Sequence, residues 1–321
     1  MRLADIYRRF ASFEAGDDSP VYRRWADGVA DDDELLGLID ELGGLKRQPQ
    51  LVFAAARFAG VQPGPFEAFR ADLLAVWPRV RETVLARRNQ TNEPGRCAAL
   101  LPLLAGLPQP LALLEVGASA GLGLYPDRYS YAYGEHRVDP ADGPSPVLLT
   151  CAVDGPAPLP TRMPEIVWRA GVDLNPLDVR DADDVRWLDS LIWPGQEFRR
   201  ARLAAAVDVV RSDPPRLVRG DLLAELPALA AQAPGGATLV VFDTAVLTYL
   251  TPSARAEFVA TVRGLDCRWL SFEGPSIAPL AGGSIPPSPD PSTALFVVER
   301  DGVPFAYAGG QGQSLHWFDR C

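Results

Sequence analysis

The chain has 321 residues, 47% of them hydrophobic and 22% charged, which is an ordinary globular composition for one large domain or two smaller ones. Its formal net charge of -10 repels phosphate backbones, so we expect no nucleic-acid partner. No apolar run approaches the ~18 uninterrupted residues that a membrane-spanning helix needs. Charged residues also interrupt the apolar positions of the N-terminal segment. We therefore expect a soluble, cytoplasmic protein with no membrane partner.

Residue types that bind metals are few and scattered. His136 and His316 are the two histidines, and the four cysteines lie far apart, at Cys97, Cys151, Cys267 and Cys321. No cysteine pair has the C-x-x-C spacing of zinc sites. We expect no metal site, and we expect the thiols to be reduced and mostly buried.

Residues 1–108 have apolar positions at helical spacing and no strand pattern. Ser19 before Pro20 predicts one helix start, and the acidic run at 31–34 predicts a second. Further helices are expected over about 50–58 and 65–88, and Thr91 is expected to cap the helix that includes 97–104. The segment is therefore predicted to be an all-helical cap subdomain.

From residue 109 onward, short apolar runs alternate with helical segments, which is the pattern of β-α units around a mainly parallel sheet. The Asp301-Gly302 dipeptide predicts a hairpin between the last two strands and hence an antiparallel edge. The fold class is therefore predicted to be α/β, with the helical subdomain preceding a core over 109–321. The predicted strands are 111–116, 166–172, 216–219, 238–242, 267–272, 294–299 and 304–308.

A small-residue turn follows the first predicted strand, over Gly117-Ala118-Ser119-Ala120-Gly121-Leu122-Gly123. We expect this turn to start a helix whose N–H groups face a ligand. A short-chain dehydrogenase also carries such a turn, but that family needs a downstream Tyr-x-x-x-Lys, and Lys46 is the only lysine in the chain.

A serine hydrolase is an open alternative, because Gly117-x-Ser119-x-Gly121 has the pattern of a nucleophile elbow. Ser119 would then act with His316 and with Asp243 or Asp266, in the chain order of that class. Two features disfavour it: no strand is predicted before residue 111, and Glu115 is an unusual neighbour for the nucleophile.

Four segments follow one another along the chain: Glu115-x-Gly117-x-Ser119-x-Gly121, Gly171-Val172-Asp173-Leu174-Asn175-Pro176, Arg219-Gly220-Asp221-Leu222 and the run at 238–250. In this order they resemble the motifs of class I S-adenosylmethionine-dependent methyltransferases. The resemblance covers about residues 111–321 and implies a Rossmann-like core, S-adenosyl-L-methionine as cofactor and methyl transfer to a small molecule. It implies that the glycine loop and the acids at the strand ends bind the cofactor, with Asp173 accepting the ribose hydroxyls and Asp221 the adenine amino group. The implied cofactor-binding residues are Glu115, Gly117, Ser119, Gly121, Asp173, Asp221, Leu222 and Asp243.

The first two motifs are further apart than is usual in that superfamily, and the excess is an insertion at about 125–165. If 129–133 were the second strand instead, Glu135 would be the ribose acid. The whole chain also resembles an uncharacterised bacterial family, through Gln90-Thr91-Asn92-Glu93-x-x-Arg96, the LLEVGASAGL segment and Trp168-Arg169-x-Gly171-x-Asp173-Leu174. That resemblance implies a methyltransferase-like fold and no known reaction, so a non-catalytic nucleotide-binding protein is a further alternative.

The acceptor side of the site is predicted from charged residues beside these motifs. We expect Asn92, Glu93 and Arg96 to face the carboxyl ends of the strands and to bind the substrate, with the helical region acting as a lid. Arg169, inside a strand, is either ion-paired, with Asp173 as a candidate partner, or a ligand for a substrate anion. If the acceptor must lose a proton, the candidate catalytic bases are Glu93, Asp243 and His316.

Overall fold

The computed structural model describes residues 2–16, 18–280, 282, 284–291 and 293–319. Cys321 therefore lies outside the described residues. The chain divides into two compact units: Met1–Thr91 with Arg180–Leu203, and Asn92–Val179 with Ala204–Cys321. The helical unit thus ends at residue 91 and takes in a later segment, whereas the sequence predicted a boundary near 108.

The first unit is helical, and its predicted helix starts are confirmed. Ser19 Oγ accepts a hydrogen bond from the Tyr22 amide at 3.4 Å, and Asp32 accepts one from the Leu35 amide at 3.0 Å. Capping side chains of this kind satisfy amides that have no partner inside the helix. The elements are α1 (Leu3–Arg9), the π-helix η1 (Phe10–Ala15), α2 (Pro20–Ala30), α3 (Asp33–Asp40), the 3-10 helix η2 (Gly44–Arg47), α4 (Pro49–Phe58), α5 (Phe66–Ala86) and α7 (Ala182–Ser190).

An aromatic cluster forms the core of this unit. The Trp25 and Phe69 rings stack with centroids 4.0 Å apart, and Phe53 packs edge-on against Trp25 at 5.6 Å. Edge-to-face and stacked contacts of this type add to the free energy gained by burying the rings. The apolar positions at helical spacing therefore form a core of their own, independent of the sheet.

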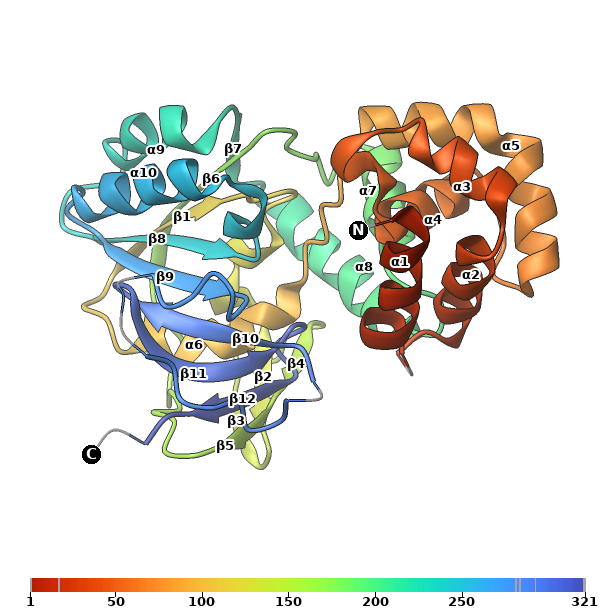
Figure 1. Ribbon diagram of the computed structural model, residues 1–321. Helices are drawn as coiled ribbons and strands as arrows, with labels where there is room; N and C mark the ends of the chain where they lie inside the picture. The colour runs from red at the N-terminus through yellow and green to blue at the C-terminus, as the bar shows by residue number, and fades with distance from the viewer. Residues whose placement is uncertain (1, 17, 281, 283, 292, 320–321) are drawn as a thin grey trace. The chain divides into compact units, whose positions relative to one another are not determined.

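The second unit contains a nine-stranded mixed sheet in the order β5-β12-β11-β10-β9-β8-β1-β6-β7 (Figure 1). β7, β6, β1, β8 and β9 are parallel, whereas β10 is antiparallel to both of its neighbours. The predicted α/β class, with a helical N-terminal region and an antiparallel C-terminal hairpin, is confirmed at this level. The strands of this sheet are β1 (Leu111–Val116), β5 (Ala152–Asp154), β6 (Ile166–Asp173), β7 (Arg216–Arg219), β8 (Thr238–Thr244), β9 (Arg268–Glu273), β10 (Leu295–Arg300), β11 (Val303–Gly309) and β12 (Ser314–Trp317).

Helices α9 (Leu222–Ala230) and α10 (Pro252–Arg263) lie together on one face of this sheet (Figure 1). Their buried side chains, such as Leu226 and Phe258, pack against Leu114, Val241 and Trp269 of the strands. These strand residues alternate with ones on the other face, as the two-residue period of a strand requires. Further helical elements are α6 (Cys97–Ala105), η6 (Leu247–Tyr249) and α8 (Glu197–Ser212). Helix α8 begins in the first unit and ends in the second.

The predicted insertion forms a separate three-stranded sheet in the order β3-β2-β4, from β2 (Ser130–Tyr133), β3 (His136–Val138) and β4 (Leu148–Thr150). β6, and not β2, pairs with β1, so the alternative assignment of 129–133 as the second strand of the core is wrong. Glu135 lies exposed in the turn between β2 and β3. In the part of the chain that the structure describes, no helix has the length and apolarity needed to cross a bilayer.

Candidate functional site

The connections of the parallel strands diverge at β1. From β1 the chain continues to β6 and β7 on one side and returns to β8 and β9 on the other, so that in chain order these strands are arranged 3-2-1-4-5. In open α/β sheets, ligands bind outside the carboxyl ends of the strands at such a switch point. The candidate site therefore comprises the segments that follow β1, β6 and β8.

The glycine loop after β1 is hydrogen-bonded within the protein. The amides of Gly117 and Ala118 donate to Val172 O at 2.8 and 3.2 Å, and the Gly121 amide donates to Ala118 O at 2.7 Å. The Ser119 amide donates to Asp173 Oδ2 at 2.9 Å. These four N–H groups therefore do not form the open cradle that phosphate-binding loops present.

No α-helix follows this loop, so that part of the prediction was wrong. The loop leads into two three-residue 3-10 helices, η4 (Leu122–Leu124) and η5 (Pro126–Arg128). Gly121 is left-handed at φ +74°, and Gly123 and Pro126 follow within five residues, which disfavours helix propagation. The loop consequently lacks a helix N-terminus aimed at a ligand.

Asp173 lies at the carboxyl end of β6, beside the glycine loop, where the sequence placed it. Its Oδ2 accepts from the Ser119 amide, and its Oδ1 accepts from the Asn175 amide at 2.7 Å. The Arg219 guanidinium in turn donates to Asn175 Oδ1 at 2.7 Å. The Asp173 carboxylate is thus fixed at the switch point by two backbone donors.

The segment before α6 also reaches the carboxyl ends of the strands. Asn92 Oδ1 accepts from the Leu122 amide at 2.8 Å, next to the glycine loop. Arg96 donates to Thr244 O at 2.8 Å, at the end of β8, and to Gly310 O at 3.1 Å, after β11. Both side chains therefore link loops of the candidate site to one another.

Glu93 is buried and lies on the same segment. Its carboxylate accepts from the Gly95 amide at 2.9 Å at the start of the 3-10 helix η3 (Pro94–Arg96). Glu93 therefore caps η3, and α6 begins at Cys97 without a side-chain cap. The prediction that Thr91 caps the helix that includes 97–104 was wrong. Gly95 is required at its position, because a Cβ there would lie 2.1 Å from Gln311 O.

Glu115 is buried inside β1, at 1% exposure. Its Oε2 has no hydrogen-bond partner among the described residues, and burial raises the pKa of this carboxyl well above its usual range. A Cβ at Gly123 would lie 2.7 Å from Glu115 Oε1, so the glycine makes room for the acid. The Glu115 side chain thus packs against the backbone at Gly123 and does not face solvent.

Three buried carboxyls line neighbouring strands, and the sequence singled out only the first of them, Asp243. Asp243 pairs in register with Ser271, which pairs with Glu299, and Glu273 lies two residues beyond Ser271. Asp243 accepts from the Trp269 indole at 2.8 Å and the Ser271 hydroxyl at 2.9 Å. An acid after the apolar run 295–298 is the sequence signal that points to Glu299, whereas Glu273 ends a strand that also holds Arg268 and Ser271.

Asp243 is poorly suited to act as a base. Burial, reinforced by the neighbouring Glu273 charge, raises the pKa of Asp243 well above its usual range. Burial therefore favours the protonated form of this carboxyl, and that form cannot take up another proton. Among the three base candidates, Glu93 lies on the segment whose Asn92 and Arg96 side chains contact the loops of the site.

Arg169 is ion-paired. Its guanidinium contacts Asp127 Oδ2 at 2.7 Å and Leu124 O at 3.1 Å, and it lies over the Tyr125 ring at 4.7 Å. The candidate partner Asp173 is instead bonded to loop amides, so that suggested pairing was wrong. Sequence reasoning missed Asp127, because it lies in the insertion 42 residues before Arg169.

The remaining predicted residues lie apart from the glycine loop or serve the fold. Asp221 is exposed and caps α9 through the Leu223 amide at 2.9 Å, and Leu222 belongs to the core under that helix. His316 lies on β12, 3.6 Å from Asp154, with four strands between β12 and β1. Strands are spaced about 4.8 Å apart, so the structure does not bring Ser119 and His316 together. Asp266 is exposed in the turn before β9 and does not complete a triad either.

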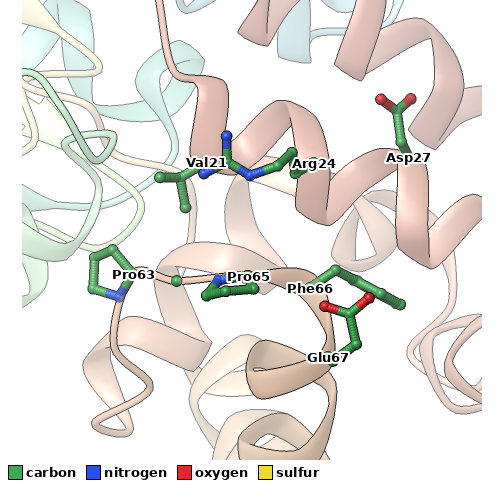
Figure 2. A pocket seen from close by; sticks show the side chains of 8 residues that line it. Val21, Arg24, Asp27, Pro63, Pro65, Phe66 and Glu67 are labelled. Carbon is green, nitrogen blue, oxygen red and sulfur yellow. The ribbon is translucent and has the colours of Figure 1, made fainter.

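A surface depression of about 610 Å³ lies in the first unit, and no predicted site residue lines it. Val21 and Arg24 of α2 face Pro63 and Pro65 across it (Figure 2). Within the described residues, no group of three or more His, Cys, Asp or Glu side chains is placed to hold a metal ion.

Fold and site together define an α/β protein with a glycine loop and a carboxylate at the switch point of its sheet. A family model described as "Uncharacterized protein conserved in bacteria (DUF2332)" matches residues 4–317. The chain belongs to this family. No curated protein matches the chain. No solved structure matches it either.

Proposed function

We propose that the chain binds S-adenosyl-L-methionine at the carboxyl ends of β1 and β6 and methylates a small molecule. The observation that carries this proposal is the contact between Asp173 Oδ2 and the Ser119 amide. It places a carboxylate at the end of the second strand directly beside the glycine loop after the first. The strand order 3-2-1-4-5 around these two segments is that of Rossmann-like methyltransferase cores.

The occupied loop amides support a nucleoside ligand without phosphates. Gly117, Ala118, Ser119, Gly121 and Leu122 all donate within the protein. A diphosphate would require such donors to be open, whereas S-adenosylmethionine carries no phosphate. The formal charge of -10 is also more compatible with a sulfonium cation than with a phosphate.

Asp173 would accept the ribose hydroxyls, because a carboxylate accepts two hydrogen bonds in a fork. Leu174, 53% exposed after β6, and Tyr249, 46% exposed after β8, offer apolar surface at the same carboxyl edge for the adenine ring. Thus a polar group for the sugar lies next to apolar surface for the base.

The bound cofactor supplies an electrophilic methyl group. The residues of this chain would then hold the acceptor in line with that group and exclude water, which accounts for most of the acceleration in a displacement of this kind. Asn92 and Arg96 would hold the loops that frame the acceptor. Glu93, buried next to them, is the base we propose for an acceptor that must lose a proton.

Asp173 can be tested by pairing a protein variant with a ligand variant. For the wild type we expect the 2′,3′-dideoxy analogue of S-adenosylhomocysteine to bind about 10- to 150-fold more weakly than the parent compound, the range for hydrogen bonds to a charged group. Asp173→Ala should weaken binding of the parent compound by a similar factor, so that the variant binds the two ligands with equal affinity. Titration calorimetry measures all four affinities.

Glu135→Ala is the matched control, since it removes an exposed acid from the β2–β3 turn. It should leave both affinities unchanged. Equal binding of the two ligands to the wild type would rule out Asp173 as the ribose acid, and so would a loss in Glu135→Ala equal to that in Asp173→Ala.

A further inference from the structure

The loop after β8 begins in a strained conformation. Ala245 has φ +59° and Ser119 has φ +51°, and both lie at the switch point, one after β8 and one after β1. The left-handed region is unfavourable for a residue with a Cβ. Asp301, the other described non-glycine residue with positive φ, lies in the β10–β11 hairpin turn, where this conformation is usual. Ala245 must therefore be held in place by its surroundings.

Glu273, at the end of β9, provides the contacts that hold it. Glu273 Oε1 accepts from the Val246 amide and from the Leu247 amide, both at 2.7 Å. The side chain is fully buried. Hydrogen bonds to an ionised acceptor are stronger than neutral ones, so the carboxylate fixes the two residues that follow Ala245.

The turn determines where Val246 lies relative to the glycine loop. A Cβ added to Gly117 would lie 2.4 Å from Val246 Cγ2, so the Val246 side chain packs directly on the Gly117 backbone. The position of Val246 therefore limits the space next to the glycine loop.

The groups around Glu273 determine when it is ionised. Asp243 of β8 and Glu299 of β10 face it as acids, and Arg96 faces it as a cation. Burial raises the pKa of Glu273, while the Leu247 and Val246 amides, the Asp243 side chain and the Arg96 charge oppose this shift. Burial and the Glu273 charge raise the pKa of Glu299 to about 7. Because the two amides favour the ionised form of Glu273, protonating this side chain weakens its hold on the loop.

On this basis we propose that Glu273 is a positioning residue of the ligand site. Its carboxylate holds the loop after β8 in the left-handed turn that seats Val246 against Gly117. The assignment rests on the proposed nucleoside site for its functional meaning, but the contacts themselves can be tested without any ligand.

The test is amide hydrogen exchange in the ligand-free protein, read at Val246 and Leu247. Glu273→Ala should accelerate exchange of both amides at least about tenfold, as expected for losing bonds to a charged acceptor. Glu273→Gln keeps an acceptor oxygen and should have a smaller effect. Glu299→Gln is the matched control, because Glu299 contacts the Leu280 amide and not this loop, and it should leave both amides protected.

A pH series separates positioning from simple packing. After correction for intrinsic exchange chemistry, protection of the two amides in the wild type should fall as pH drops through the raised pKa of Glu273. In Glu273→Gln this step should disappear. Unchanged protection in a folded Glu273→Ala variant would overturn the proposal. If that variant does not fold, a pH step that persists in Glu273→Gln would overturn it.

Calorimetry with S-adenosylhomocysteine distinguishes this proposal from the proposed function. If the wild type binds no ligand but the exchange results hold, the nucleoside site is wrong and the role of Glu273 in the loop stands. If the wild type binds and Glu273→Ala binds equally well, Glu273 does not position the ligand site.

Discussion

Replacing Gly117 with alanine should destabilise the second unit by about 2–5 kcal/mol. Gly117 has φ +71°, which costs a Cβ-bearing residue about 1–2 kcal/mol. The new Cβ would also lie 2.4 Å from Val246 Cγ2, and overpacking of this kind adds about 1–3 kcal/mol. Urea unfolding of the intact chain, compared with the wild type, measures the sum.

Gly134→Ala separates these two contributions. Gly134 has a similar φ of +61°, but a Cβ added there would meet nothing within 4 Å, so only the conformational cost of about 1–2 kcal/mol should appear. Combining Gly117→Ala with Val246→Ala should restore the stability that overpacking removes, because Val246→Ala takes away the atoms that the new Cβ would meet. This gain is measured as a favourable coupling energy between the two sites. Equal costs for the two glycine variants would contradict the close contact between Gly117 and Val246.

Replacing Arg169 with methionine should cost up to about 3–5 kcal/mol, the penalty for removing the closest counter-charge of a buried carboxylate. Arg128 Nε also lies 3.6 Å from Asp127 Oδ2, but its side chain is 51% exposed and compensates less. Arg169 and Asp127 lie 2.7 Å apart, with side chains 9% and 14% exposed. Burial already raises the pKa of Asp127, and Arg169 is the first group that opposes the shift. Without Arg169 the folded-state pKa of Asp127 rises further above its unfolded value. The deficit of the variant should therefore shrink as pH is lowered and Asp127 becomes protonated in the fold.

The double variant Arg169→Met with Asp127→Leu serves as the control. Removing both charges should restore most of the lost stability, because no buried charge is left without a partner. A loss below about 1 kcal/mol for Arg169→Met alone would be typical of an exposed pair and would contradict a structural role. Unfolding curves at two pH values give both comparisons.

Apolar runs predicted β1 and β6 to β11 of the main sheet, and Asp301-Gly302 correctly predicted the C-terminal hairpin. β2, β3, β4, β5 and β12 were missed because they have only three or four residues each. Strands this short are too brief to show an alternation of apolar and polar residues. Their pairing also depends on strands that lie far away in the sequence. The helix predicted after Gly121 does not form, because Gly121, Gly123 and Pro126 favour turns. The prediction had followed the usual strand-turn-helix order of α/β folds instead.

Parts of the candidate site could be read from the motifs, and other parts could not. Asp173 lies beside the glycine loop as its motif predicts, and Asn92 contacts that loop. The Arg169 partner was not predictable, since Asp127 lies in an insertion whose path the motif does not specify. Glu273 was missed because its partners are the backbone amides of another loop. Every residue except proline has such an amide, so no sequence pattern identifies these two.

We propose that the switch point of the sheet binds a nucleoside without phosphates. The most direct test of this claim is a calorimetric titration of the purified wild type with S-adenosylhomocysteine, with adenosine diphosphate as the matched ligand. The arrangement of Asp173 and the occupied loop amides predicts saturable one-to-one binding of S-adenosylhomocysteine and no binding of the diphosphate at the same concentration. Absence of S-adenosylhomocysteine binding, or binding of the diphosphate that equals or exceeds it, would contradict the claim.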